Sequence, residues 1–79
     1  MYVREISNLI YSKRDLAEAR QAFAKFLDVK VVPVSYGRVS LSVGVLSAFQ
    51  NQEREIVLEF FNYLLDAAIQ RRMSEMANG

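Results

Sequence analysis

The strongest pattern of apolar and polar positions lies in the middle of the chain and predicts a β-hairpin. Residues 38–46 alternate between two sides, with Val39, Leu41, Val43 and Val45 on one and Ser40, Ser42 and Gly44 on the other. This period of two is typical of a strand with one buried face. Residues 29–36 are rich in β-branched side chains, and Gly37 permits a tight turn between the two segments. Pro33 lacks a backbone donor, so we expect its strand at an edge of the sheet and residues 38–46 at the centre.

Two further segments have the spacing of helices. The first, residues 13–28, has Ser12 as its N-cap and Asp15 three positions later, which is the pattern of a capping box. Its apolar residues share one face: Leu16, Ala19, Phe23, Phe26 and Leu27. The second, residues 51–76, begins with Asn51 as its N-cap. Residues 2–11 have mixed periodicity and are expected to form a strand with a bulge at Asn8.

The order of these elements is β-α-β-β-α, in one domain over residues 1–79. We expect an α+β fold of two layers, in which a three-stranded sheet with strand order 1-3-2 carries both helices on one face. Ser40, Ser42 and Gly44 then lie on the uncovered face. Their small side chains make that face suitable either for solvent or for docking of a protein or an extended peptide.

The last helix is apolar around too much of its circumference for a single core. One stripe consists of Ile56, Phe60, Tyr63, Leu64 and Ala67, and its neighbour of Val57, Phe61, Leu65, Ala68 and Ile69. Such a helix is buried on more than one side, and at about 1.5 Å per residue it is longer than a domain of this size. We therefore expect a homodimer or larger oligomer, with one of the two stripes in the interface.

Asp66 lies in this apolar region, between Leu65 and Ala67. It does not meet Arg71 at the i,i+4 spacing of a helix, so a buried Asp66 needs an arginine from another element or subunit. The candidates are Arg4, Arg38 and Arg71 of a second chain. The alternative is a solvated Asp66, since most aspartates are exposed.

The amino-acid composition excludes most kinds of catalytic and metal-binding site. The chain has neither cysteine nor histidine, which excludes disulfides, thiolate metal sites and the commonest general base. Glu53, Glu55 and Glu59 cluster at the start of the last helix, where the helix dipole favours acids, and no calcium-loop spacing is present. We therefore expect a protein that is not an enzyme and holds no metal and no cofactor.

Charge and hydropathy give the remaining expectations. Charged residues interrupt the N-terminal segment, and no run reaches the roughly 18 apolar residues of a membrane span, so we expect a cytoplasmic protein. The net charge of +1 leaves no basic footprint for nucleic acid. Tyr36 and Arg38 flank the turn and offer an aromatic ring and a cation for stacking on a base, which keeps nucleic-acid binding as an alternative.

The last helix also carries a family resemblance. Residues 60–71, with the sequence FFNYLLDAAIQR, resemble the C-terminal helix of the HxsD-like proteins of the His-Xaa-Ser system. Leu64, Leu65, Asp66 and Arg71 match, whereas Ala67 replaces a tyrosine and Gln70 stands near an expected arginine. The resemblance implies a small non-catalytic accessory protein that binds a radical-SAM enzyme or the ribosomally made precursor peptide. The alternative is a small homodimeric structural or regulatory protein. The residues expected at an interaction surface are Tyr36, Arg38, Ser40, Ser42, Phe61, Leu65, Asp66, Ile69 and Arg71.

Overall fold

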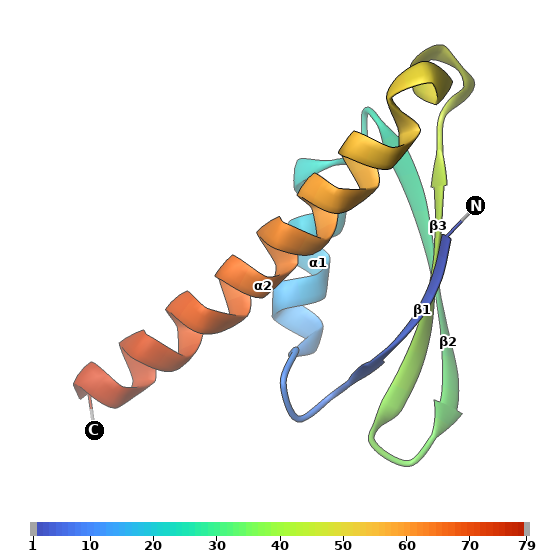
Figure 1. The fold of residues 1–79 in the computed structure, drawn as a ribbon. Helices are drawn as coiled ribbons and strands as arrows, with labels where there is room; N and C mark the ends of the chain where they lie inside the picture. The colour runs from blue at the N-terminus through green and yellow to red at the C-terminus, as the bar shows by residue number, and fades with distance from the viewer. Residues whose placement is uncertain (1, 79) are drawn as a thin grey trace.

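The order of the elements along the chain confirms the predicted β-α-β-β-α pattern. The computed structural model describes residues 2–78. Its elements are β1 (Tyr2–Ser7), α1 (Lys13–Ala22), β2 (Leu27–Ser35), β3 (Arg38–Val45), a 3-10 helix η1 (Ser47–Gln52) and α2 (Glu53–Asn78). Both α-helices lie on the same side of the sheet, which gives the two layers of a small α+β fold (Figure 1).

The three strands form an antiparallel sheet in the predicted order β1-β3-β2. Pro33 explains this order, because it lies in β2 at an edge of the sheet, where a missing N–H does not interrupt the ladder. The register with β3 shifts between Pro33 and Ser35, which marks a bulge beside the hairpin turn. Gly37 in that turn has a φ of 77°, a left-handed conformation that favours glycine.

The core lies between α2 and the helix-facing side of β3. Leu41 and Val43 of β3 are fully buried there, and Val45 continues the same row. Phe60 of α2 is also fully buried and packs edge-to-face against Phe23, with the ring centroids 5.6 Å apart. The valine-rich side of the central strand therefore supplies the floor of the core, as its alternation predicts.

α1 ends earlier than its apolar spacing predicts, at Ala22 rather than at residue 28. Residues 23–26 form turns, and Leu27 and Asp28 belong to β2 instead. Leu27 pairs with Val45 of the central strand and is 3% exposed. Pairing with β3 buries Leu27 as fully as a helix would, so the helical spacing of apolar residues misplaced the boundary.

The N-terminal strand is also shorter than predicted, because β1 ends at Ser7 rather than at residue 11. The carbonyl of Ser7 accepts N–H groups from Ile10 and Tyr11, at 3.2 and 3.1 Å, and this turn directs the chain toward α1. The bulge predicted at Asn8 is wrong. The N–H of Asn8 donates to the carbonyl of Gly37 at 2.8 Å, one step beyond the last β1–β3 pair, so Asn8 continues the regular register.

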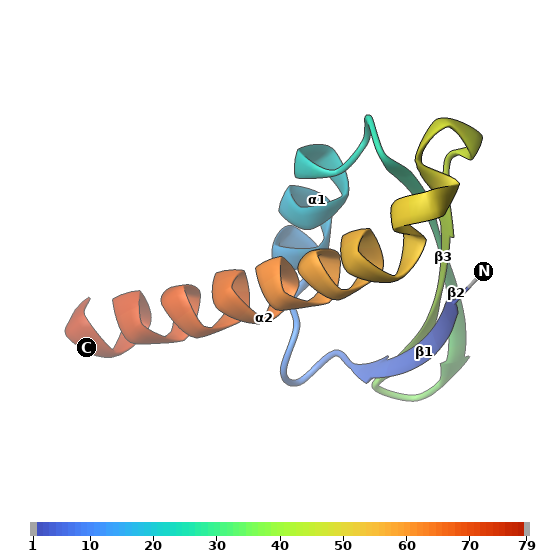
Figure 2. The same ribbon diagram turned by 45° about the horizontal axis from the view of Figure 1, so that its top comes forward.

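α2 is the longest element and reaches well past the sheet. η1 precedes it, so Asn51, the predicted N-cap, lies inside the 3-10 helix and α2 begins at Glu53. The first half of α2 covers the sheet, whereas the second half crosses the start of α1 and projects beyond the sheet (Figures 1 and 2). The molecule is accordingly elongated, with principal extents of 44 × 27 × 16 Å.

Candidate interaction surface

The buried side of α2 draws on both of the predicted stripes. Its members are Ile56, Val57, Phe60, Leu64 and Ala68, none more than 9% exposed. Tyr63, assigned to the first stripe, is 42% exposed, while Ala68, assigned to the second, is 2% exposed. Ala68 therefore packs inside its own chain and does not face a partner, because the centre of the buried face follows the i,i+4 row through Phe60 and Leu64.

A row of apolar side chains runs along another side of α2, and we call it the outer stripe. Its members repeat every three or four residues: Leu58, Phe61, Leu65, Ile69, Met73 and Met76. Leu65 and Ile69 are 43% and 45% exposed, and Met76 reaches 79%. The middle of this row is expected from the sequence. The prediction did not include its two ends, Leu58 and the pair Met73 and Met76, although these residues continue the same helical spacing.

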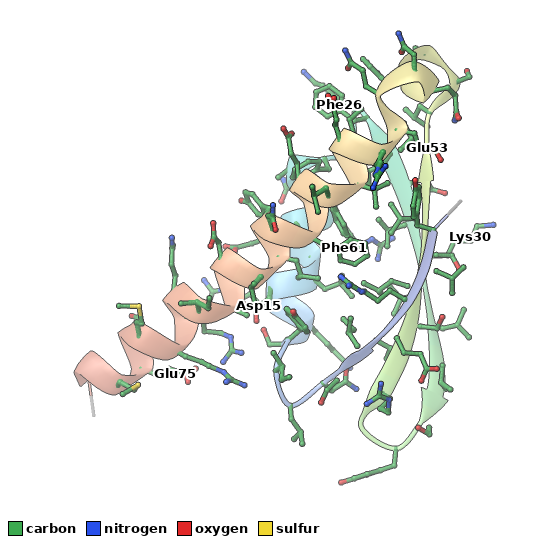
Figure 3. The ribbon with its side chains drawn as sticks, in the orientation of Figure 1. Asp15, Phe26, Lys30, Glu53, Phe61 and Glu75 are labelled. Carbon is green, nitrogen blue, oxygen red and sulfur yellow. The ribbon has the colours of Figure 1, made fainter. Side chains whose placement is uncertain are left out.

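Phe61 forms the border between the outer stripe and β1. Its ring is partly buried, and it points from α2 toward β1 (Figure 3). The guanidinium of Arg4 lies 4.9 Å from the centroid of the Phe61 ring, a cation–π distance. Arg4 pairs across the sheet with Leu41, so it belongs to the helix-facing side of β1. The ion pairs found among the described side chains do not include Arg4, whose cation rests on the aromatic ring.

A partly buried ion pair joins the start of α1 to the projecting half of α2. Nε of Arg71 donates to both carboxylate oxygens of Asp15, at 3.2 and 3.0 Å. Asp15 is 2% exposed and forms the predicted capping box with Ser12, through reciprocal hydrogen bonds of 3.0 and 3.1 Å. Burial opposes ionisation of Asp15, but the hydrogen bonds from Ser12 and Arg71 outweigh it and lower the pKa of the carboxyl. Asp15 therefore stays charged and holds the two helices together. The sequence indicated only its capping role.

Both arginines near the end of α2 also hold the loop between β1 and α1. Nη2 of Arg72 donates to the carbonyl of Leu9 at 2.7 Å, and Nη2 of Arg71 to that of Ile10 at 3.4 Å. Arg71 further pairs with Glu75 at 3.2 Å. Arg71, expected at a partner interface, is thus engaged within its own chain. Because Arg71 and Arg72 have these intramolecular partners, the two cations lend no support to nucleic-acid binding.

Asp66 is exposed on α2, in agreement with the solvated alternative for a single chain. None of the side-chain ion pairs found among residues 2–78 includes Asp66. Arg71 and Arg38 contact Asp15 and Glu5 of the same chain. A partner for Asp66 from a second chain therefore stays a prediction.

The other residues expected at an interaction surface lie away from the outer stripe. Tyr36 is fully exposed at the hairpin turn, and Arg38 beside it pairs with Glu5 at 3.4 Å. Ser40 and Ser42 lie on the sheet face opposite the helices, because their neighbours along β3 point into the core. The structure therefore brings together only the apolar α2 members of the expected set.

A hollow of about 420 Å³ lies between α1 and the projecting half of α2, beside the Asp15–Arg71 pair. Arg14, Glu18 and Glu75 line it, so its wall carries charges of both signs. Among residues 2–78, no three acidic side chains converge in a way that suits a metal ion. The hollow thus indicates no particular ligand, whereas the apolar outer stripe indicates a contact with another protein.

The fold and this surface define a small two-layer α+β protein with an uncovered apolar side on its longest helix. Within the part of the chain that the structure describes, every helix is too short or too polar to cross a membrane. Comparisons with protein-family models, curated proteins and solved structures found no match to this chain.

Proposed function

We propose that this protein is a non-catalytic binding protein that docks on another protein through the outer stripe of α2. The observation that carries the proposal is the row of apolar side chains left exposed on a helix whose other side already covers the sheet. Continuous apolar surface of this kind marks contact sites in small proteins. Side chains at i, i+3, i+4 and i+7 fit a groove or a second helix of a partner.

The anchoring of the projecting half of α2 supports this role. Arg71 and Arg72 tie the helix to Asp15 and to the carbonyl of Leu9, at 3.0 and 2.7 Å. The far end of the outer stripe, with Met73, therefore belongs to an element held in place before a partner arrives. Such preorganisation reduces the conformational entropy that binding must overcome.

The partner we propose follows from the resemblance of residues 60–71 to the HxsD-like proteins. It is a radical-SAM enzyme of the cytoplasm, or the precursor peptide that this enzyme modifies. Among the matching residues, Leu64 lies in the core and Arg71 pairs with Asp15, so both have roles in the fold. Leu65 and Asp66 are exposed, which makes them the matching residues that a partner can reach.

The proposal predicts that genes for a radical-SAM enzyme and a short precursor peptide lie beside the gene for this protein. Calorimetry with the purified protein and these two products then tests binding. We expect a complex that Leu65→Asp weakens by about tenfold or more, because a carboxylate then replaces an apolar contact in the middle of the outer stripe. Glu59→Ala, on another side of α2, is the matched control and leaves the affinity unchanged. Circular dichroism confirms that both variants fold.

The two negative outcomes of this experiment have different meanings. Equal affinities of the Leu65→Asp and Glu59→Ala variants would exclude the outer stripe as the docking surface. Absence of any complex with enzyme or precursor would remove the proposed partner.

The outer stripe favours a second candidate, self-association. A row of apolar side chains on one helix is self-complementary when two copies pack about a twofold axis. Leu58, Phe61 and Leu65 also have the alternating three- and four-residue spacing of helix-pair seams. Sedimentation of the protein alone decides: a dimer that Leu65→Asp dissociates supports this candidate, and a monomer at micromolar concentration removes it. In such a dimer, Asp66→Ala weakens assembly more than Glu59→Ala does.

A further inference from the structure

Within residues 2–78, β1 leaves one edge of the sheet without a neighbouring strand. The N–H of Asn8 donates to the carbonyl of Gly37 at 2.8 Å, one step beyond the last pair of the β1–β3 ladder. In an antiparallel ladder, hydrogen-bonded pairs alternate with pairs that are not hydrogen-bonded. The even-numbered residues of β1 therefore bond to β3, and the N–H and C=O groups of Val3 and Glu5 point to the open edge.

The opposite edge of the sheet is protected from further pairing. β2 carries Pro33, which has no N–H, and its register shifts between Pro33 and Ser35. Prolines and bulges are devices by which proteins protect sheet edges. β1 contains no proline, and its pairs with β3 run without a register shift. One edge of this sheet is therefore suited to the addition of an extended chain.

The first part of the outer stripe, from Leu58 to Leu65, belongs to the half of α2 that covers the sheet. Phe61 stands over Arg4 on the helix-facing side of β1. Around α2, the helical spacing leads from the buried Leu64 through Phe61 to the exposed Leu65 and Leu58, so these two side chains lie on the side of Phe61 away from β3. A strand added next to β1 would therefore run beneath them.

We propose that the open edge of β1 binds an extended segment of the partner protein as a fourth strand beneath Leu58, Phe61 and Leu65 of the outer stripe, an inference that rests on the proposed function. Side chains of that segment that face α2 lie opposite Tyr2, Arg4 and Ile6, because opposed residues of neighbouring strands share a face. An acidic side chain suits the position opposite Arg4, and apolar side chains suit the two positions beneath the stripe. The segment thus has the pattern apolar-x-acidic-x-apolar, in either chain direction.

A second copy of β1 fits the same edge less well. Pairing about a twofold axis centres the ladder on one residue, which then lies opposite its own copy. The registers with the longest overlap centre on Arg4 or Glu5 and place like charges opposite each other, which destabilises the pair. The charge of β1 therefore favours a segment of different sequence.

A fluorescently labelled peptide, Thr-Val-Thr-Glu-Thr-Val-Thr, tests the proposal by anisotropy with the full chain. We expect saturable binding, with NMR shift changes at the amides of Val3 and Glu5. Lysine in place of the peptide's glutamate, or Arg4→Ala in the protein, weakens binding about two- to fivefold. Val3→Pro removes an edge N–H and weakens it about tenfold or more, whereas Val3→Ala keeps that N–H and stays within about twofold of the wild type.

N-methylation of the peptide amides requires no change in the protein and is expected to abolish binding, since the backbone donors are lost. Undiminished binding of the methylated peptide, or of the original peptide to Val3→Pro, would overturn strand addition. If the peptide fails to bind while the radical-SAM enzyme binds and Leu65→Asp weakens that complex, strand addition is wrong and the proposed function stands. A dimer that Val3→Pro dissociates would assign the edge to a second copy and overturn the proposal as well.

Discussion

Leu64 and Leu65 are adjacent residues of the same type, and alanine at each position tests which side of α2 faces the core. Leu64 is 1% exposed, whereas Leu65 is 43% exposed. Replacing a fully buried leucine costs about 2–5 kcal/mol, because apolar burial is lost and a cavity remains. Leu65 keeps much of its surface in water, so its replacement costs about 1 kcal/mol or less. Leu64→Ala is therefore expected to be clearly the less stable variant.

Urea unfolding followed by circular dichroism measures both free energies. A chain of 79 residues has a total stability of about 4–12 kcal/mol. With a urea slope of about 1 kcal/mol/M, the midpoint falls by about 2 M or more for Leu64→Ala and by about 1 M or less for Leu65→Ala. A low protein concentration keeps association from adding to the Leu65 effect. If Leu65→Ala lost as much stability as Leu64→Ala, the orientation of α2 would be wrong and the outer stripe with it.

Asp15→Asn lowers the free energy of unfolding at neutral pH by about 1–3 kcal/mol, because the buried carboxylate accepts a charged hydrogen bond. Since its pKa is lowered on folding, ionised Asp15 stabilises the protein fully above its unfolded pKa near 3.8. The wild type therefore loses this advantage over Asp15→Asn as the pH falls below that value and through the lowered pKa of the folded state, and a constant difference in acid unfolding curves would contradict the ion pair. Ser12→Ala removes the N-cap of α1 and costs about 1 kcal/mol in the urea assay; no loss would argue against the capping box. Gly37→Ala costs about 1–2 kcal/mol because the φ of 77° strains other residues. Gly44→Ala is neutral or slightly stabilising, since an added methyl meets nothing within 4 Å. Thermal melts compare the two glycine variants, and equal losses would contradict the turn geometry.

Short-range physical chemistry was enough to determine the hairpin, the strand order and the start of α1. Side chains two positions apart on a strand share a face, so the row from Val39 to Val45 predicted which side of the central strand is buried. Pro33 has no backbone N–H whatever its surroundings, and a strand without that donor fits best at an edge. This local property predicted the position of β2 in the sheet. Ser12 and Asp15 cap each other within one turn, so their hydrogen bonds need no distant partner.

The tertiary structure decided which side each apolar residue of α2 faces and where α1 ends. Leu64 and Leu65 have the same hydrophobicity, and only the position of α2 on the sheet makes one of them core and the other surface. In the same way, pairing with β3 took Leu27 from a helical pattern into a strand. The Asp15–Arg71 pair joins residues 56 positions apart in the chain. Its members meet because α2 crosses α1, and no local spacing encodes that meeting.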